Sequence, residues 1–367
     1  MNLTDNLLTL PPFNFSDVDR KKLYWPAVIE TFKHHESKNE IFQSLCQQSS
    51  WQPEGYESII HMPFIPVQSF KQMELISVPH SSILDIRNSS STSSAFPSVV
   101  QRDAVTLDRY RKSRNAVLDN YCQTRYPIQI GVIQDPKKSN NSRLSANLVV
   151  DVIESRSKSN HTYYVIEEQN ETVIFDFKKF INLYHEYQDG IGLVFGHTAY
   201  IYLFLTLELK RRNKHLHLSN TTMLHGWGWK KYADKAVSHA TFMADIQKFL
   251  GIPASSILDM YGFAESNTLY LECCAGFRHV PLWEDVLIRD PVSLEILPDG
   301  EDGLLQFISA IPMSYPGVSI LTDDIGSKNH EEMCPCGRQG VSFKVKRRAN
   351  KEDTKAMEKI AMDLVHL

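Results

Sequence analysis

The sequence TMLHGWGW at residues 222–229 decides the fold, because it is a short apolar strand that ends in two closely spaced glycines. A helix is predicted directly after it, at Lys231–Leu250, and another strand at Ile257–Met260. The same alternation precedes it, with strands at Thr172–Phe175 and Gly192–Phe195 and helices at Phe177–Tyr187 and Thr198–Lys214. Alternating strands and helices are typical of an α/β fold with a parallel sheet flanked by helices.

The pattern differs at the two ends of the chain. Apolar residues recur at helical spacing from Asp17 to Gln48, which predicts a helical N-terminal cap over residues 1–60. From Val286 onward, short apolar runs separated by Asp-Gly turns predict a β-rich C-terminal part. We therefore expect an α/β body over residues 61–345 and a short tail over residues 346–367.

The bulk composition is that of an ordinary globular protein. The 367 residues are 42% hydrophobic and carry a net charge of −4, with 39 basic against 43 acidic side chains. This balance offers no polybasic surface for nucleic acid. The chain has no run of 18 apolar residues and no basic, apolar leader at its N-terminus, so we expect no membrane span and a cytoplasmic location.

A run of hydroxyl side chains, Ser89 to Ser94, follows a strand-like segment. Hydroxyls and backbone N–H groups at such a place can surround phosphate oxygens, as glycine-rich loops do. The alternative is a serine-rich loop that only faces solvent. For a phosphate site the side chains expected to contribute are Ser89, Ser90, Thr92 and Ser93.

Two strand ends carry glycines beside aromatic residues. Gly226 and Gly228 follow the strand at 222–224, where glycine permits close approach of a flat ligand. A packing turn that buries two tryptophans is the alternative. Tyr261 and Gly262 follow the strand at Ile257–Met260, and ligands of α/β sheets bind at the carboxyl ends of strands.

Two carboxylates lie close to these turns or strands. Glu265, after Tyr261-Gly262, offers an oxygen ligand for Mg²⁺, which needs only one or two protein carboxylates. Asp324, expected in a turn after a strand at Ser319–Leu321, could accept hydrogen bonds from both hydroxyls of a ribose. The alternative for Asp324 is an ordinary Asp-Gly turn.

Four of the six cysteines gather in the C-terminal third of the chain. Cys273, His279, Cys334 and Cys336 form a set of soft and borderline ligands that suits a tetrahedral structural zinc ion. Reduced, buried thiols without a metal are the alternative.

Read together, these residues resemble the adenylate-forming superfamily, and most closely the acyl-protein synthetases of the LuxE family. Phenylacetate-CoA ligases are similar more loosely. The resemblance runs through most of the chain, and its strongest stretches are residues 63–71, 224–231, 290–291, 314–317, 334–338 and 343–345.

The resemblance implies activation of a fatty, aryl or similar carboxylic acid by ATP and Mg²⁺ to an acyl-adenylate. The acyl group would then pass to an acceptor on another molecule: a carrier-protein thiol, CoA, an amine or a partner protein. It also implies roles for single residues: Ser89 to Ser94 as phosphate loop with Thr92 near the triphosphate, residues 225–228 beside adenine and acyl pockets, Tyr261 on adenine, Glu265 on Mg²⁺, Asp324 on ribose, and Arg348 as hinge arginine.

The sequence departs from the family pattern at four positions. Ser91 and Ser94 replace the glycines of the phosphate loop, and Arg347 replaces the hinge glycine. Alignment on Arg348 puts Met357 where the synthetases have the cysteine that receives the acyl group, and a thioether cannot form a thioester. The full mobile lid domain is also expected to be absent. The alternative function is therefore a catalytically degenerate member that binds an acyl group or nucleotide as a scaffold or partner subunit.

Overall fold

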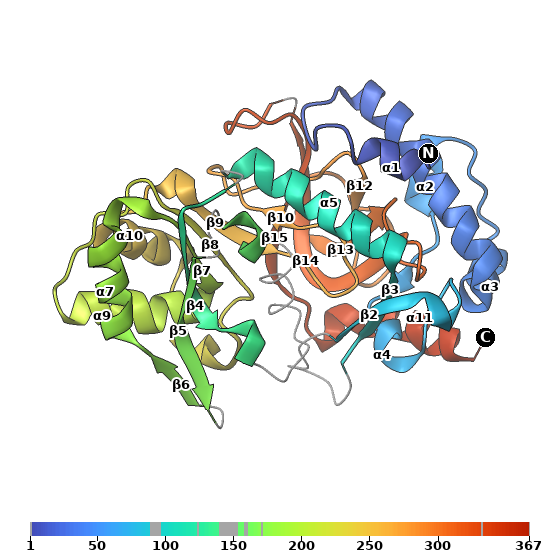
Figure 1. Cartoon of the computed structure of the whole chain (residues 1–367). Helices are drawn as coiled ribbons and strands as arrows, with labels where there is room; N and C mark the ends of the chain where they lie inside the picture. Colours follow the sequence, from blue (N-terminus) through green and yellow to red (C-terminus); the bar gives the residue numbers. More distant parts are fainter. Residues whose placement is uncertain are drawn as a thin grey trace. The chain divides into compact units, whose positions relative to one another are not determined.

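The computed structural model describes residues 2–88, 97–122, 125–138, 153–157, 161–169, 172–331 and 333–366 (Figure 1). The chain forms two compact units. The first unit consists of Met1–Asn120, Gly262–Tyr270 and Ala275–Leu367, and the second of Tyr121–Tyr261 and Leu271–Cys274. Across the described ranges, every helix is too short or too polar to cross a membrane. The predicted boundaries at residues 60 and 345 stay a prediction.

The second unit contains the predicted α/β sheet, with strand order β10-β9-β8-β7-β4-β5-β6. Strands β9, β8, β7, β4 and β5 are parallel, and β6 pairs antiparallel with β5, so the sheet is mixed. The strands are β4 Ile128–Gln134, β5 Thr162–Gln169, β6 Thr172–Phe175, β7 Ile191–His197, β8 Thr222–Gly226, β9 Ile257–Tyr261 and β10 Tyr270–Leu271.

Helices cover one face of this sheet. They are α7 Phe177–Tyr187, α8 Thr198–Tyr200, α9 Leu207–Arg211 and α10 His239–Leu250. Their apolar side chains form one core with the inward-facing residues of the strands, among them Phe180, Leu205, Ile246 and Ile130. The predicted α/β fold is thereby confirmed.

Two helices of this unit differ from the prediction. The predicted helix Lys231–Leu250 is instead a 3-10 segment, Lys230–Lys235, followed by α10, because Tyr232 has non-helical backbone angles and the Ser238 hydroxyl caps α10 at the N–H of Thr241. The predicted helix Thr198–Lys214 contains a π-helical turn at Ile201–Thr206 between α8 and α9. Such turns interrupt α-helices without ending them.

The first unit is built on a six-stranded sheet with the order β11-β15-β14-β13-β12, in which β1 also pairs, in parallel, with β14. The strands are β1 Ile65–Pro66, β11 Arg278–His279, β12 Glu284–Arg289, β13 Gly303–Ser309, β14 Ser319–Glu331 and β15 Gly340–Arg348, with β2 Ile83–Asn88 and β3 Val99–Asp103 forming a separate antiparallel pair. The β-rich C-terminal part is confirmed.

Strand β14 corrects the prediction for residues 322–326. They lie inside this long strand and not in an Asp-Gly turn after Leu321. Gly326 is needed for strand pairing, because a Cβ there would lie 2.1 Å from the Lys344 carbonyl oxygen of β15. The pairing with β15 also shifts register between Ile325 and Gly326, as at a β-bulge.

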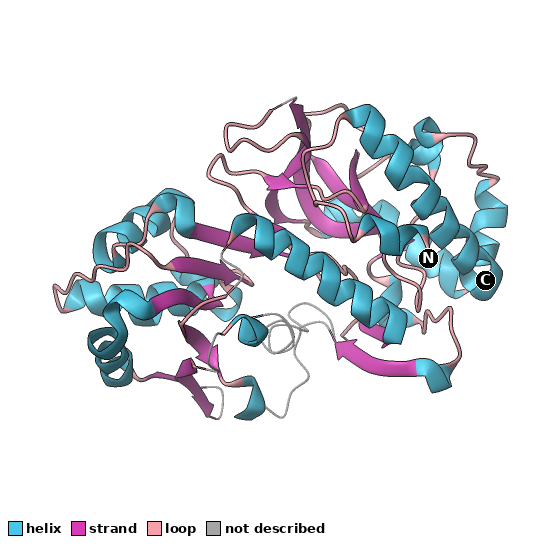
Figure 2. Ribbon diagram, turned by 45° about the horizontal axis from the view of Figure 1, so that its top comes forward, coloured by secondary structure: helices cyan, strands magenta, loops and turns pink. Residues whose placement is uncertain are grey.

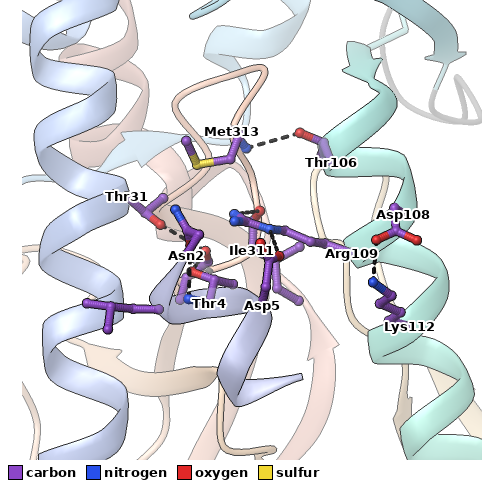
Figure 3. A network of polar contacts seen from close by, with 12 residues as sticks. Asn2, Thr4, Asp5, Thr31, Thr106, Asp108, Arg109, Lys112, Ile311 and Met313 are labelled. Carbon is purple, nitrogen blue, oxygen red and sulfur yellow. Dashed lines mark hydrogen bonds and ion pairs between the residues drawn. The ribbon is translucent and has the colours of Figure 1, made fainter. Parts of the chain in front are cut away.

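The helices of this unit are α1 Leu3–Leu7, α2 Asp17–Lys38, α3 Glu40–Ser49, α4 Ser69–Gln72, α5 Ala104–Tyr121 and α11 Lys351–Val365. Figure 2 shows them in cyan around the magenta sheet. In the region predicted as a helical N-terminal cap, α2 and α3 meet at Asn39, whose side chain caps α3 at the Phe42 N–H. Polar bonds fix α1 and α5 to the loop after β13: Arg109 bonds Asp5 at 2.8 Å and the Ile311 carbonyl at 3.3 Å (Figure 3).

The residues predicted as a tail contain the end of β15 and helix α11. Asn350 and Asp353 form a capping box at the start of α11. Met357 is 0% exposed and packs in a small core with Leu304, Leu321 and Ile325. At this position the methionine is therefore a packing residue.

Candidate active site

Glu265 is a buried carboxylate with an unsatisfied oxygen. It lies in the Gly262–Tyr270 segment of the first unit and is 3% exposed. Its Oε1 has no hydrogen-bond partner among the described residues. Burial, with a smaller contribution from Asp323, raises the pKa of Glu265 to about 7. A buried carboxylate oxygen without a donor fits a hard cation, because Mg²⁺ binds through one or two carboxylates.

The backbone around Glu265 is fixed by polar contacts. The Tyr315 hydroxyl donates to the Glu265 carbonyl at 2.7 Å and accepts from the Asn267 amide at 2.6 Å. The Ser266 hydroxyl donates to the Thr268 carbonyl at 3.1 Å. The segment is therefore held in one conformation by its own unit, as a metal-binding carboxylate requires.

Asp324 and Arg348, two predicted site residues, pair across neighbouring strands. They are directly opposite in the β14–β15 register, and Arg348 Nη1 lies 3.2 Å from Asp324 Oδ1. Arg348 Nη2 lies 2.8 Å from Asp323 Oδ2. The Arg348 side chain is 61% exposed, whereas the Asp323 and Asp324 side chains are 14% and 10% exposed, so the arginine side of these ion pairs faces solvent. Asp324 presents a charged acceptor from a rigid strand.

In the second unit, the end of β8 carries His225 and Gly226. The His225 Nδ1 lies 3.0 Å from Thr198 Oγ1 and 3.6 Å from Asp259 Oδ1. Because the Thr198 hydroxyl donates its single hydrogen to the Gly226 carbonyl at 3.1 Å, its lone pair accepts from an Nδ1–H of His225. These contacts fix the orientation of the imidazole at the strand end.

The glycines after β8 have different roles. A Cβ at Gly226 would lie 2.8 Å from the Met260 carbonyl oxygen, so glycine lets β8 and β9 approach. Gly228 has a φ of 61° and follows Trp227, which has the left-handed φ of 60° that is rare for a bulky residue. The Trp227 ring lies 5.0 Å from His197, centroid to centroid, while Trp229 packs against the core of the unit. The packing alternative therefore holds for Trp229.

The other predicted nucleotide residues have less defined surroundings. Tyr261 ends β9 and Gly262 begins the next segment of the first unit. The nearest atom to a Cβ at Gly262 would be the Thr268 carbonyl oxygen at 3.6 Å, so the backbone does not require glycine there. Residues Ser89, Ser90, Thr92 and Ser93, with the rest of the predicted phosphate loop, lie outside the described residues.

Three of the four predicted zinc ligands come together in the first unit. The ligand atoms of His279, Cys334 and Cys336 lie within 4.8 Å of one another, and Cys336 Sγ is 3.2 Å from His279 Nε2. Burial lowers the pKa of His279 to about 4, which keeps the imidazole neutral. Cys273 belongs to Leu271–Cys274, directly before the first unit resumes at Ala275.

The loop that carries the two cysteines has the form of a tight turn. The Cys334 N–H donates to the Arg338 carbonyl at 2.9 Å, and the Gly337 N–H donates to the Cys334 carbonyl at 2.8 Å. Gly337 has a φ of 85°, which glycine adopts without strain. The turn brings two thiols to one side of a rigid loop, which is compatible with zinc.

Comparison with solved structures identifies the class of fold. The chain superimposes on 2-hydroxyisobutyryl-CoA ligase in complex with 2-HIB-AMP and CoA with a TM-score of 0.65 at 12% identity, covering 92% of this chain and 76% of the ligase. The same ligase in the postadenylation state gives a TM-score of 0.65 at 13% identity, covering 92% and 69% of the two chains. The fold is that of the adenylate-forming ligases.

Comparison of sequences then identifies the family. Residues 1–363 match the family model "Acyl-protein synthetase, LuxE", so the chain belongs to this family. It is 25% identical over 357 residues to the long-chain-fatty-acid–luciferin-component ligase of Vibrio harveyi, covering 96% of this chain and 90% of the relative. The ligase of the same name from Aliivibrio fischeri is 24% identical over 369 residues, covering 100% and 94%. Members of the family are ligases that activate an acid with ATP and pass the acyl group to another molecule.

Sequence reasoning missed the partners that orient these residues. Asp323, which shares Arg348 with Asp324, is marked in the sequence only by being its neighbour. Thr198, which fixes His225, and Tyr315, which holds the Glu265 backbone, lie 27 and 50 residues away along the chain. No local sequence motif predicts either contact.

Proposed function

We propose that the protein activates a long-chain fatty acid with ATP and transfers the acyl group to a partner protein. The names of the two relatives support the acid, and the family description supports a protein acceptor. The observation that carries the proposal is Glu265, a buried carboxylate whose Oε1 has no hydrogen-bond partner within the described part of the chain and whose pKa is raised to about 7. A purely structural buried acid is normally hydrogen-bonded at both oxygens.

In this proposal the first unit holds the ribose and the metal ion. Glu265 binds the Mg²⁺ that accompanies ATP, and that ion supplies neutralisation of phosphate charge. Asp324 accepts hydrogen bonds from the ribose hydroxyls once Arg348 turns away from it. Their surroundings support these roles, because Glu265 Oε1 has no hydrogen-bond partner among the described residues and the Arg348 side chain that pairs with Asp324 is 61% exposed.

The remaining predicted residues bind the base and the phosphates. Tyr261 stacks on adenine, and Gly226, Gly228 and Gly262 let the backbone approach the nucleotide. The hydroxyls of Ser89, Ser90, Thr92 and Ser93 contact the triphosphate.

The chemistry needs two displacements. A carboxylate oxygen of the acid attacks the α-phosphorus of ATP, the P–O bond to pyrophosphate breaks, and an acyl-adenylate forms. A nucleophile of the partner protein then attacks the acyl carbonyl, loses its proton to solvent, and AMP leaves. Positioning and charge stabilisation supply most of such catalysis. Met357 takes no part, because it is a thioether and is 0% exposed.

We further propose that Cys273, His279, Cys334 and Cys336 bind a structural zinc ion. Three ligand atoms within 4.8 Å of one another, a neutral imidazole and a tight Cys-Pro-Cys-Gly turn support it. Elemental analysis should find about one zinc per chain, and Cys336→Ser should lower both the zinc content and the melting temperature. Cys274→Ser, which changes an exposed thiol, is the control and should change neither. Zinc-free protein of full stability contradicts the site.

The test of the acid is ATP–pyrophosphate exchange with saturated fatty acids of increasing length, together with aryl and amino acids. The proposal predicts exchange that rises with chain length and is negligible with amino acids. Calorimetry of ATP binding accompanies it. Absence of exchange with every acid, together with absence of ATP binding, would leave the scaffold alternative.

A further inference from the structure

Arg102 is a fully buried cation that contacts the segment around Glu265. It lies in β3 and is 0% exposed. Its Nη2 donates to the Ala264 carbonyl at 3.0 Å, and its Nε donates to Asn267 Oδ1 at 3.1 Å. Ala264 directly precedes Glu265, and Asn267 follows it by two residues. One guanidinium therefore bridges the backbone carbonyl just before the carboxylate and the Asn267 side chain just after it.

The bridge is part of a larger set of contacts within the first unit. Asn267 also donates to the Tyr315 hydroxyl at 2.6 Å, and that hydroxyl donates to the Glu265 carbonyl at 2.7 Å. The Ser113 hydroxyl of α5 donates to the Asn267 carbonyl at 2.6 Å. Residues 264, 265 and 267 are thus each fixed by a side chain from elsewhere in the fold, which sets the direction of the Glu265 side chain.

Burial of the Arg102 cation costs free energy, so a role in stability alone does not explain why an arginine is present here. Asp85, which lies opposite it in the β2–β3 register, is its carboxylate partner at 3.5 Å and also pairs with Arg87. The Tyr110 ring lies 4.8 Å from the Arg102 guanidinium and 4.2 Å from that of Arg114, which is also buried. Apolar residues often replace buried ion pairs without loss of stability. The bidentate contact with residues 264 and 267 offers a reason for the arginine.

We propose that Arg102 is a positioning residue that holds Glu265 in the orientation needed to bind the metal ion of the nucleotide. The inference rests on the proposed role of Glu265. Strand β3 also pairs with β2, so Arg102 connects this strand pair to the segment that carries Glu265. A lysine cannot reproduce the two directed bonds of the guanidinium.

The test compares Arg102→Lys with Arg109→Lys. Arg109 is an equally buried arginine, 1% exposed, that also contacts one carbonyl and one side chain, but far along the chain at Ile311 and Asp5. The first measurement is the affinity for Mn²⁺·ATP by electron paramagnetic resonance. The second is the Mg²⁺ dependence of ATP–pyrophosphate exchange, and thermal unfolding reports the stability of each variant.

Arg102→Lys should weaken Mn²⁺·ATP binding about tenfold and raise the half-saturating Mg²⁺ concentration by a similar factor, as is typical when the partner of a metal ligand is lost. Arg109→Lys should lower the melting temperature and leave both quantities unchanged. Equal metal dependence in the two variants overturns the inference. If Arg102→Lys does not fold, Tyr315→Phe decides in its place, since it removes the hydroxyl that donates to the Glu265 carbonyl and accepts from Asn267, which Arg102 also contacts. Wild-type protein without exchange or Mn²⁺·ATP binding would instead overturn the proposed function.

Discussion

Replacing Glu265 by glutamine should stabilise the metal-free protein at alkaline pH. Burial raises the pKa of Glu265 from 4.5 to about 7, so the folded state favours the protonated acid. The stability that protonation provides is fully present below pH 4.5 and is lost as the pH rises through about 7. Glutamine resembles the protonated acid at every pH, so the variant does not lose this stability as the pH rises.

The expected magnitude follows from the pKa. One unit corresponds to about 1.4 kcal/mol, so a rise from 4.5 to about 7 corresponds to about 3 kcal/mol. Urea unfolding followed by tryptophan fluorescence should give free energies for wild type and Glu265→Gln that differ by less than about 1 kcal/mol at pH 5. At pH 9 the variant should be more stable by about 3 kcal/mol. The same variant should have no ATP–pyrophosphate exchange.

The control is Glu284→Gln. Glu284 is also buried, and burial raises its pKa to about 7 as well, but it accepts a hydrogen bond from the Tyr270 hydroxyl. Glu284→Gln should show a similar alkaline trend while retaining exchange. The raised pKa of Glu265 would be contradicted by either of two results. One is a stability difference between Glu265→Gln and wild type that is the same at pH 5 and pH 9, and the other is a variant that is less stable than wild type at pH 9.

Four further substitutions test other parts of the site and fold. Asp324→Asn should raise KM for ATP about 10- to 100-fold and leave KM for the acid unchanged, because hydrogen bonds to a charged acceptor contribute about 1.5–3 kcal/mol. Steady-state kinetics measures both constants, and an unchanged KM for ATP would show that Asp324 does not bind the ribose. Met357→Ala should lower the free energy of unfolding in urea by about 2–5 kcal/mol and leave the KM values unchanged, because Met357 is 0% exposed in the core that α11 covers. A changed affinity for the nucleotide would contradict a role in packing alone. Gly226→Ala should lower the melting temperature, because the new Cβ would lie 2.8 Å from the Met260 carbonyl oxygen. Gly262→Ala should not lower it, because the nearest atom to that Cβ would be the Thr268 carbonyl oxygen at 3.6 Å. Equal changes in melting temperature would contradict the strand geometry.

The sequence predicts the parallel sheet well because its signals are local. Strands β8 and β9 were expected at 222–224 and 257–260 and extend to 226 and 261. Apolar runs that end in glycine mark such strands without any knowledge of the fold. The start of α10 was wrong by eight residues, because the polar stretch after Lys231 has helix-compatible composition and only the cap at Ser238 fixes the first turn.

The site is harder to predict because its chemistry depends on distant contacts. Asp324 was assigned to a turn, since Asp and Gly near each other favour turns, but pairing with β15 keeps it in a strand. The motif around Glu265 indicates a carboxylate, but its burial and its fixed backbone come from residues such as Arg102, which contacts Asn267 across 165 positions. Local sequence patterns do not predict such long-range contacts.

A protein that forms an acyl-adenylate transfers a carboxylate oxygen of the acid to AMP. The most direct measurement is a reaction with a long-chain fatty acid labelled with ¹⁸O in both carboxylate oxygens, followed by mass spectrometry of the AMP released after acyl transfer to a nucleophile. We expect one ¹⁸O atom in AMP, because the bond to the α-phosphorus keeps that oxygen when the acyl carbonyl is attacked. Label in inorganic phosphate, or unlabelled AMP formed at the rate of acyl transfer, would contradict it.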